Sequence, residues 1–165
     1  MVLLVVAMAI FAIWAKVPFV PTPKRTVQAM LDEAKLKDGD TIYDLGAGDA
    51  RMLIQAKRIC PGIRAIGYEI VPFVWLLGRL RIWFSRVDVD LRWGNAIKKD
   101  VSDADCIVLY LITELMPKFE AKFNKELKPG VRVISHSFSF PGHEPVKKLL
   151  VPGWLGKERV LVYEW

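Results

Sequence analysis

The residues best suited to chemistry lie in residues 41–53, which read TIYDLGAGDARML. A short apolar run ends in Asp44, and Gly46, Gly48 and Asp49 follow within five positions, just before the expected start of a helix. Because glycine has no Cβ, a turn that contains two glycines lets the backbone approach a ligand closely. We interpret this segment as a ligand-binding turn between a strand and a helix.

The charges in this turn indicate which ligand it binds. A dinucleotide-binding fingerprint has a third glycine where this chain has Arg51. Asp44 and Asp49 would repel a pyrophosphate, since like charges at close range are unfavourable. The same two carboxylates suit a cationic ligand without phosphate. S-adenosylmethionine, which carries a sulfonium and an α-amino group, is such a ligand.

A further acid favours a nucleoside ligand. Glu69 ends the next apolar segment, AIGYE, at the place where nucleotide-binding folds position an acid on the ribose hydroxyls, about 20 residues after the glycine turn. Gly94, Asn95 and Ala96 follow the third apolar segment, and the side-chain oxygen of Asn95 can accept a hydrogen bond from an adenine amino group. An ordinary turn explains these last three residues equally well. Together the two motifs favour S-adenosylmethionine over NAD.

Apolar segments alternate with helical patterns along the chain, which predicts a mostly parallel sheet with helices on both faces, a Rossmann-like α/β fold. The first helix should begin at Pro23 with Thr22 as its N-cap. Two more strands near the end of the chain should close the sheet as an antiparallel hairpin. The expected strands are 42–45, 65–69, 89–93, 106–111, 131–135, 146–151 and 158–165, and the later helices are 50–59, 72–84 and 115–127.

The chain starts with MVLLVVAMAIFAIWA, which contains no polar side chain. As a helix this stretch would reach ~22 Å, less than the ~30 Å hydrocarbon core of a bilayer. We expect residues 1–16 to form a retained hydrophobic helix that anchors the protein, residues 17–23 a proline-rich connector, and residues 24–165 one domain. Packing of the helix on the domain, or on another copy, is the alternative.

If the helix inserts, Lys16, Lys24 and Arg25 place the domain on the cytoplasmic face of the membrane by the positive-inside rule. Without insertion the protein would be cytoplasmic. The net charge of +6 favours anionic partners in general, but no RNA-binding motif is evident, so nucleic acid is not the expected partner. His136 and His143 are a weak metal-binding signal, and we expect no metal.

The helical segment PFVWLLGRLRIWFSR, residues 72–86, combines four large apolar side chains with three arginines. We expect it to be a core helix whose arginines face water, because large apolar side chains are usually buried. Contact with anionic lipid is the alternative. The apolar residues in question are Trp75, Leu76, Leu80 and Trp83, and the arginines are Arg79, Arg81 and Arg86.

Four segments together resemble one family: PFVPTP, DLGAGDAR, GYEIVPFVW followed by GRLRIW, and SFSFPG. They are similar to class I, seven-strand S-adenosylmethionine-dependent methyltransferases, and among these to the small membrane-associated protein-lysine methyltransferases that modify the adenine nucleotide translocase and the c-ring protein of ATP synthase. The resemblance runs from Pro18 to Trp165. It implies S-adenosylmethionine as cofactor and a lysine of a membrane-associated protein as acceptor.

The alternatives are a methyltransferase that acts on RNA or a small molecule, and a non-catalytic, membrane-tethered assembly factor that binds S-adenosylmethionine. The sequence departs from the family pattern at three positions. Ala50 replaces a usual glycine, Asn95 stands where aspartate is common, and Ser137 stands where arginine is frequent. The last difference concerns the acceptor more than the cofactor.

The resemblance implies a set of site residues. Phe19, Val20, Pro21 and Thr22 would cover the cofactor, and Phe138, Phe140 and Pro141 would border the acceptor channel. The expected cofactor contacts are Val20, Thr22, Asp44, Gly46, Ala47, Gly48, Asp49, Arg51, Glu69, Ile70, Asn95 and Ala96.

Methyl transfer to an amine is an in-line displacement, so the protein must align the acceptor and present it uncharged. At neutral pH, deprotonation of a lysine costs about 4.6 kcal/mol, and an apolar channel lowers this cost by disfavouring the ammonium. No single catalytic residue is assigned. The candidates are Tyr110, Glu114, His136, Phe138 and Phe140. Each has a structural explanation too: core aromatics, a helix-dipole acid at Glu114 and a loop-edge histidine at His136.

Overall fold

The computed structural model describes residues 20–153 and 156–165. The predicted hydrophobic helix, its insertion into a membrane and the position of Phe19 therefore lie outside the described residues. Within the described ranges, every helix is too short or too polar to cross a bilayer.

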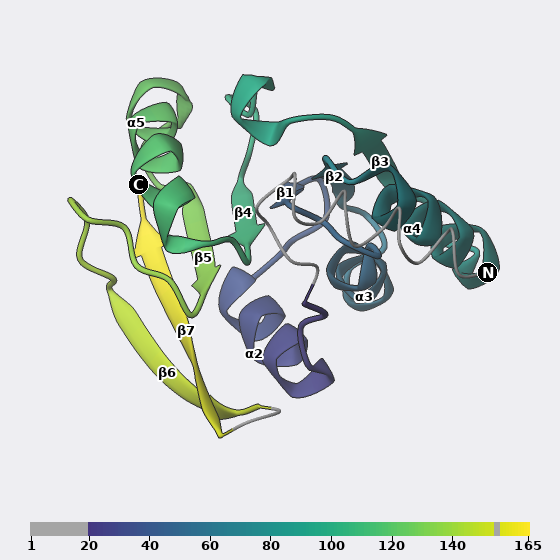
Figure 1. The fold of residues 1–165 in the computed structure, drawn as a ribbon, viewed down its shortest axis with the longest axis horizontal. Coiled ribbons are helices and arrows are strands. Elements are labelled where there is room, and N and C mark those ends of the chain that lie inside the picture. The colour runs from purple at the N-terminus through teal and green to yellow at the C-terminus, as the bar shows by residue number, and fades with distance from the viewer. Residues whose placement is uncertain (1–19, 154–155) are drawn as a thin grey trace, which may run out of the picture.

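One seven-stranded sheet forms the centre of the domain, in the order β3-β2-β1-β4-β5-β7-β6 (Figure 1). The first five strands are parallel, while β7 runs antiparallel to both β5 and β6. The predicted sheet and its closing hairpin are confirmed. The strands are β1 Thr41–Leu45, β2 Arg64–Glu69, β3 Asp90–Trp93, β4 Cys106–Leu109, β5 Arg132–His136, β6 Lys147–Pro152 and β7 Lys157–Glu164.

Helices cover both faces of the sheet, as the alternating pattern predicted. Side chains of α2 and α3 belong to one hydrophobic cluster, to which α4 also adds residues, whereas α5 contributes to a second cluster on the opposite face. The helices are α2 Lys24–Ala34, α3 Arg51–Ile59, α4 Pro72–Ser85 and α5 Met116–Glu126, and two 3₁₀ helices cover Ala96–Lys98 and Thr113–Leu115.

The central strand β1 shows why the sheet forms. All five of its residues are buried, as expected for a parallel strand with both faces covered. Ile42 packs in the cluster of α2 and α3, and Tyr43 and Leu45 pack in the cluster of α5. This alternation follows from the two-residue period of a strand.

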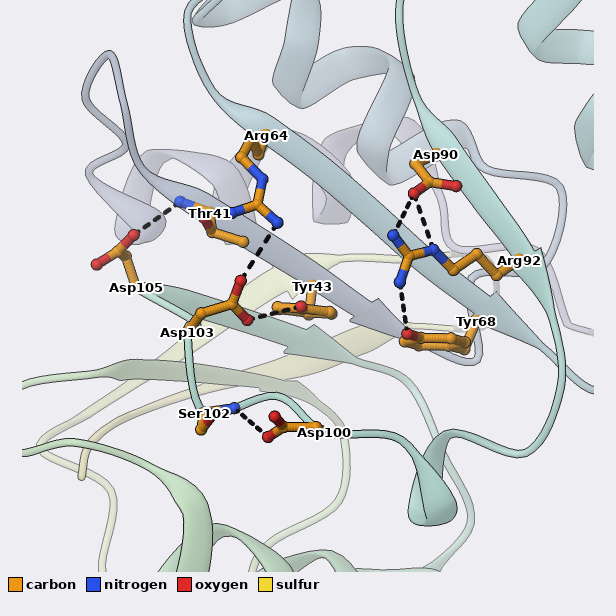
Figure 2. Close-up of polar contacts among 10 residues, drawn as sticks. All are labelled: Thr41, Tyr43, Arg64, Tyr68, Asp90, Arg92, Asp100, Ser102, Asp103 and Asp105. Atoms are coloured by element: carbon orange, nitrogen blue, oxygen red, sulfur yellow. Dashed lines mark hydrogen bonds and ion pairs between the residues drawn. The ribbon is translucent and has the colours of Figure 1, made fainter.

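On the α5 side of the sheet, two stacked tyrosines cover β1 and β2, with ring centroids 6.3 Å apart. Figure 2 shows that both hydroxyls have polar partners. The Tyr43 hydroxyl donates to Asp103 at 2.7 Å, and Arg92 donates to the Tyr68 hydroxyl at 3.0 Å. Asp103 also pairs with Arg64 at 3.2 Å. Paired polar ends allow the tyrosine rings to be buried without leaving unsatisfied hydroxyls.

The predicted start of the first helix is wrong in detail. Helix α2 begins at Lys24, and its N-cap residue is Pro23, with no side-chain capping bond. Thr22 does not cap the helix. Its carbonyl oxygen instead accepts a hydrogen bond from Arg51 at 2.9 Å. The side chain of Thr22 lies at a pocket described below.

The prediction that residues 72–84 form a core helix is also wrong. Of the residues in α4, only Val74 and Gly78 are fully buried. A Cβ at position 78 would lie 2.5 Å from Leu91 Cδ2 and 3.1 Å from the carbonyl oxygen of Gly48. The helix therefore contacts the domain closely along one narrow stripe that needs a glycine, and most of its large apolar side chains face outward.

Candidate active site

A pocket lies at the carboxyl ends of β1, β2 and β4, where the strand order reverses and where open α/β sheets bind ligands. The glycine turn, the segment before α2 and the loops after β2, β4 and β5 surround it. Most of the residues predicted from the sequence line this pocket. They are Val20, Pro21, Thr22, Asp44, Gly46, Ala47, Gly48, Asp49, Arg51, Glu69, Ile70, Tyr110 and Phe138.

The glycine turn folds over the end of β2. The amides of Gly46 and Ala47 both donate to the carbonyl oxygen of Tyr68, at 2.9 and 3.0 Å. Gly46 has a φ of 95°, which favours glycine. Ala50 has a φ of 62°, in the left-handed region. This backbone conformation explains why a glycine is usual where this chain has Ala50.

Glu69 joins the glycine turn to the loop after β2. Its carboxylate accepts hydrogen bonds from the amide of Gly48 at 2.9 Å and from the amide of Val71 at 2.8 Å, one on each oxygen. Burial raises the pKa of Glu69, and these backbone hydrogen bonds oppose the shift. A carboxylate has about four acceptor sites, so capacity remains for a hydrogen bond from a ligand hydroxyl.

Asp49 has a different role from the one its sequence position suggested. Its carboxylate pairs with Arg51 at 2.7 Å and with Arg81 of α4 at 2.8 Å. Burial favours the neutral acid, but the hydrogen bonds and charges of the two arginines prevail and hold the pKa of Asp49 below its usual value. Two cations therefore compensate its charge, so Asp49 itself does not disfavour a phosphate ligand.

Asp44 is buried and receives no hydrogen bond from any residue that the structure describes. Burial, together with the charges of Glu69 and Asp49, raises its pKa to about 8. A cationic ligand would favour the ionised form of this carboxyl. Asp44 is thus a buried acid without a hydrogen-bond donor among the described residues, and Glu69 can accept hydrogen bonds from ribose hydroxyls. Both features fit S-adenosylmethionine, which is cationic and has no phosphate.

Aromatic rings form the side of the pocket nearest β4 and β5. The ring of Tyr110 lies 3.9 Å from that of His136 and 6.2 Å from that of Phe138, between centroids. Tyr110 and Phe138 line the pocket, and His136 lies behind Tyr110. These two rings are the part of the predicted acceptor channel that the structure brings together.

His136 is the last residue of β5 and is fully buried, so its prediction as a loop-edge histidine is wrong. Its Nε2 atom lies 2.9 Å from Glu158 Oε2. Glu158 also accepts a hydrogen bond from the Thr26 hydroxyl at 2.7 Å. Burial lowers the pKa of His136, and the carboxylate of Glu158 opposes this shift. Through its contacts with His136 and Thr26, the Glu158 side chain on β7 links this strand to β5 and α2.

The remaining candidates lie outside the pocket lining. Glu114 is exposed in the second 3₁₀ helix, and Pro141 is exposed after β5. Phe140 is buried against Phe123 and Tyr163 in the α5 cluster, because its ring fills that core. Asn95 caps the first 3₁₀ helix through a bond from the amide of Ile97, and Ala96 is buried beside it.

Five apolar lining residues were not predicted from the sequence. Val71 directly follows Glu69 and Ile70, while Leu109 and Ile112 flank Tyr110, so their neighbours provided a signal. Met30 and Met52 belong to helices, and no local sequence pattern shows which face of those helices points toward the pocket. The five residues are Met30, Met52, Val71, Leu109 and Ile112.

We predict that Asp44→Asn raises the melting temperature of the cofactor-free protein at pH 8 and leaves it nearly unchanged at pH 4. The pKa of Asp44 is about 8 in the folded chain, against about 3.9 in an unfolded one. Between these values the folded state binds more protons, so its stability falls as the pH rises from about 4 to about 8. Asparagine removes this penalty. Differential scanning fluorimetry across this pH range measures the effect.

The control is Asp88→Asn, which changes an exposed carboxyl. It should shift the melting temperature little at either pH. A lower melting temperature for Asp44→Asn at pH 8 would contradict the electrostatic role given to Asp44.

Comparison with known proteins places the chain in a family. The family model of the ANTKMT methyltransferase domain matches residues 44–147. A protein-lysine N-methyltransferase from Saccharolobus islandicus is 34% identical over 142 residues, which cover 82% of this chain and 85% of that protein. The adenine nucleotide translocase lysine N-methyltransferase of Mus musculus is 30% identical over 174 residues, 95% of this chain and 73% of that protein.

Among solved structures, an RNA methyltransferase from Salinibacter ruber in complex with S-adenosyl-L-homocysteine has a TM-score of 0.80 and 33% sequence identity. The match covers 88% of this chain and 93% of that one. The family match, the seven-stranded sheet and the acidic pocket beside the glycine turn lead to one conclusion. The chain belongs to the ANTKMT methyltransferase family and is a class I methyltransferase that uses S-adenosylmethionine.

Proposed function

We propose that the protein is a protein-lysine N-methyltransferase whose acceptor belongs to a membrane-associated protein. The observation that carries the proposal is the aromatic wall of Tyr110 and Phe138 in the same pocket as Asp44 and Glu69. The acidic residues suit a cationic cofactor. The apolar wall beside them suits an amine acceptor that must lose its positive charge before it reacts. The activities of the relatives from Saccharolobus islandicus and Mus musculus support the choice of lysine.

When bound, S-adenosylmethionine supplies an electrophilic methyl group. Asp44 would face its cationic portion, and Glu69 would accept hydrogen bonds from its ribose. The lysine ammonium must lose a proton to solvent before its nitrogen lone pair attacks, and Tyr110 and Phe138 favour the neutral amine by excluding water. Burial raises the pKa of Tyr110, so its hydroxyl is protonated at neutral pH and is no general base. The wall therefore acts through desolvation and alignment.

A second candidate is methylation of RNA. The structure of the RNA methyltransferase from Salinibacter ruber supports it, since that enzyme is 33% identical and matches over 93% of its length. The net charge of +6 also allows a polyanionic substrate. The labelling experiment below separates the two candidates.

We predict that Glu69→Gln weakens binding of S-adenosylmethionine by about 10- to 100-fold, because it removes one charged acceptor from the backbone and from the ribose. Isothermal titration calorimetry measures the affinity. The matched control is Glu120→Gln, since Glu120 is also buried and accepts a hydrogen bond from the amide of Gly142 at 2.8 Å, but lies outside the pocket lining. Equal affinities for both variants would contradict the role of Glu69.

Transfer of labelled methyl groups identifies the acceptor class. Purified protein, membranes and tritiated S-adenosylmethionine should give label that acid hydrolysis releases as methyllysine. Total RNA incubated in parallel should remain unlabelled. Glu69→Gln should lower the incorporation, which shows that the label depends on the described pocket. Label confined to RNA would replace the lysine proposal with the second candidate.

We further propose that residues 1–16 hold the protein at the cytoplasmic face of a membrane. The support is their composition, which lacks polar side chains up to Lys16. The full chain should remain in the membrane pellet after carbonate extraction, and a chain without residues 1–16 should move to the supernatant. An unchanged distribution of the shortened chain would show that the segment is not the anchor.

A further inference from the structure

Helix α4 exposes a continuous apolar stripe. The side chains of Trp83 and Phe84 are 71% and 74% exposed, and Leu76, Leu77 and Leu80 are exposed beside them. At 100° per residue these five positions lie on one side of the helix. The rings of Trp83 and Phe84 contact each other at 4.7 Å between centroids, so the two aromatics form one surface.

Positive charge borders this stripe. Arg79 is exposed and lies along one edge of it by its helical spacing, and Arg86, also exposed, is the C-cap residue directly after the helix. Arg81 lies along the other edge and pairs with Asp49 at 2.8 Å. The helix contains no acidic residue. Exposed tryptophan, phenylalanine and leucine between arginines are typical of a helix that lies in the interface of an anionic bilayer.

Further exposed apolar side chains lie at the rim of the pocket, near the start of α4. Trp93 is 62% exposed, and its indole donates a hydrogen bond to the carbonyl oxygen of Ile70 at 3.0 Å. Ile70 is itself exposed, lines the pocket and lies two residues before the start of α4. Val20, where the described chain begins, lines the same pocket.

We propose that the exposed face of α4 binds the surface of an anionic lipid bilayer. We name it the α4 lipid face and define it by Leu76, Leu77, Leu80, Trp83 and Phe84 with Arg79 and Arg86. It is a contact in addition to any made by residues 1–16, and it does not depend on which substrate the enzyme methylates. Bound in this way, the domain would hold the rim at Ile70 and Trp93 close to the membrane.

Site-specific quenching in the full chain tests the proposal. The background variant is Cys60→Ser, which leaves the buried Cys106 as the remaining cysteine. Leu80→Cys is labelled with a fluorophore that doxyl-labelled lipid quenches. The control label is placed at Leu150→Cys, because Leu150 is 64% exposed on β6 and β6 lies at the end of the sheet away from α4 (Figure 1).

In vesicles that contain phosphatidylglycerol, doxyl lipid should quench the label at position 80 and leave the label at position 150 unquenched. Pure phosphatidylcholine or high salt should weaken the quenching, since the arginines interact with anionic headgroups. In the labelled chain, Trp83→Ser with Phe84→Ser should reduce quenching at position 80 to the level at position 150. The affinity for S-adenosylmethionine should stay the same in this variant, which shows that the domain is folded.

Absence of quenching at position 80 in phosphatidylglycerol vesicles would overturn the proposal. If the label is then shielded from an aqueous quencher, residues 1–15 or a second copy of the chain cover α4 instead. If the label is open to the aqueous quencher, the membrane contact is limited to other parts of the chain. Either result is independent of methyl transfer, so it leaves the proposed function to its own test.

Discussion

The carboxylate of Glu69 fixes the geometry on which the pocket depends. Its two oxygens accept the amides of Gly48 and Val71, so one side chain joins the turn after β1 to the loop after β2. The two loops belong to neighbouring parallel strands, and the amides of Gly46 and Ala47 join the same turn to the end of β2. The same side chain lines the pocket, where its remaining acceptor capacity is open to a ligand hydroxyl.

The pocket gathers acidic residues in a basic protein. Asp44, Asp49 and Glu69 are all buried at one edge of the sheet, although the chain has a net charge of +6. The protein compensates Asp49 with two arginines and leaves Asp44 without a partner among the described residues. An uncompensated buried acid lowers stability in the absence of ligand. Such a loss of stability is typical of binding sites, whose side chains are arranged to fit a ligand and not to stabilise the free protein.

The sequence predicted the sheet, the order of the elements and most of the pocket. Alternation of apolar segments and helical periods identifies strands and helices, and the chemistry of Asp44, the glycines and Glu69 follows from residue types next to one another in the chain. The exposure of α4 could not be predicted, because periodicity shows which side chains share a face and not which face is covered. The close packing of Gly78 against Leu91 and Gly48 determines which face of α4 is covered.

The pairing of Asp49 with Arg81 and the burial of His136 against Glu158 were also beyond the sequence. Each joins residues of different elements, and a local pattern contains no information about such partners. Thr22 shows the same limit. A threonine before a proline is a good helix cap by local rules, yet the hydrogen bond from Arg51 to its carbonyl oxygen positions that segment beside the pocket.

The contacts around the glycine turn differ in what their separation would break. Arg81 of α4 pairs with Asp49, and Gly78 packs closely against Gly48, so parting α4 from the turn would break an ion pair and a packed contact. On the side of Val20–Thr22, the bond from Arg51 to the carbonyl oxygen of Thr22 is a single hydrogen bond. Arg51 thus joins the glycine turn, through Asp49, to the segment that precedes α2.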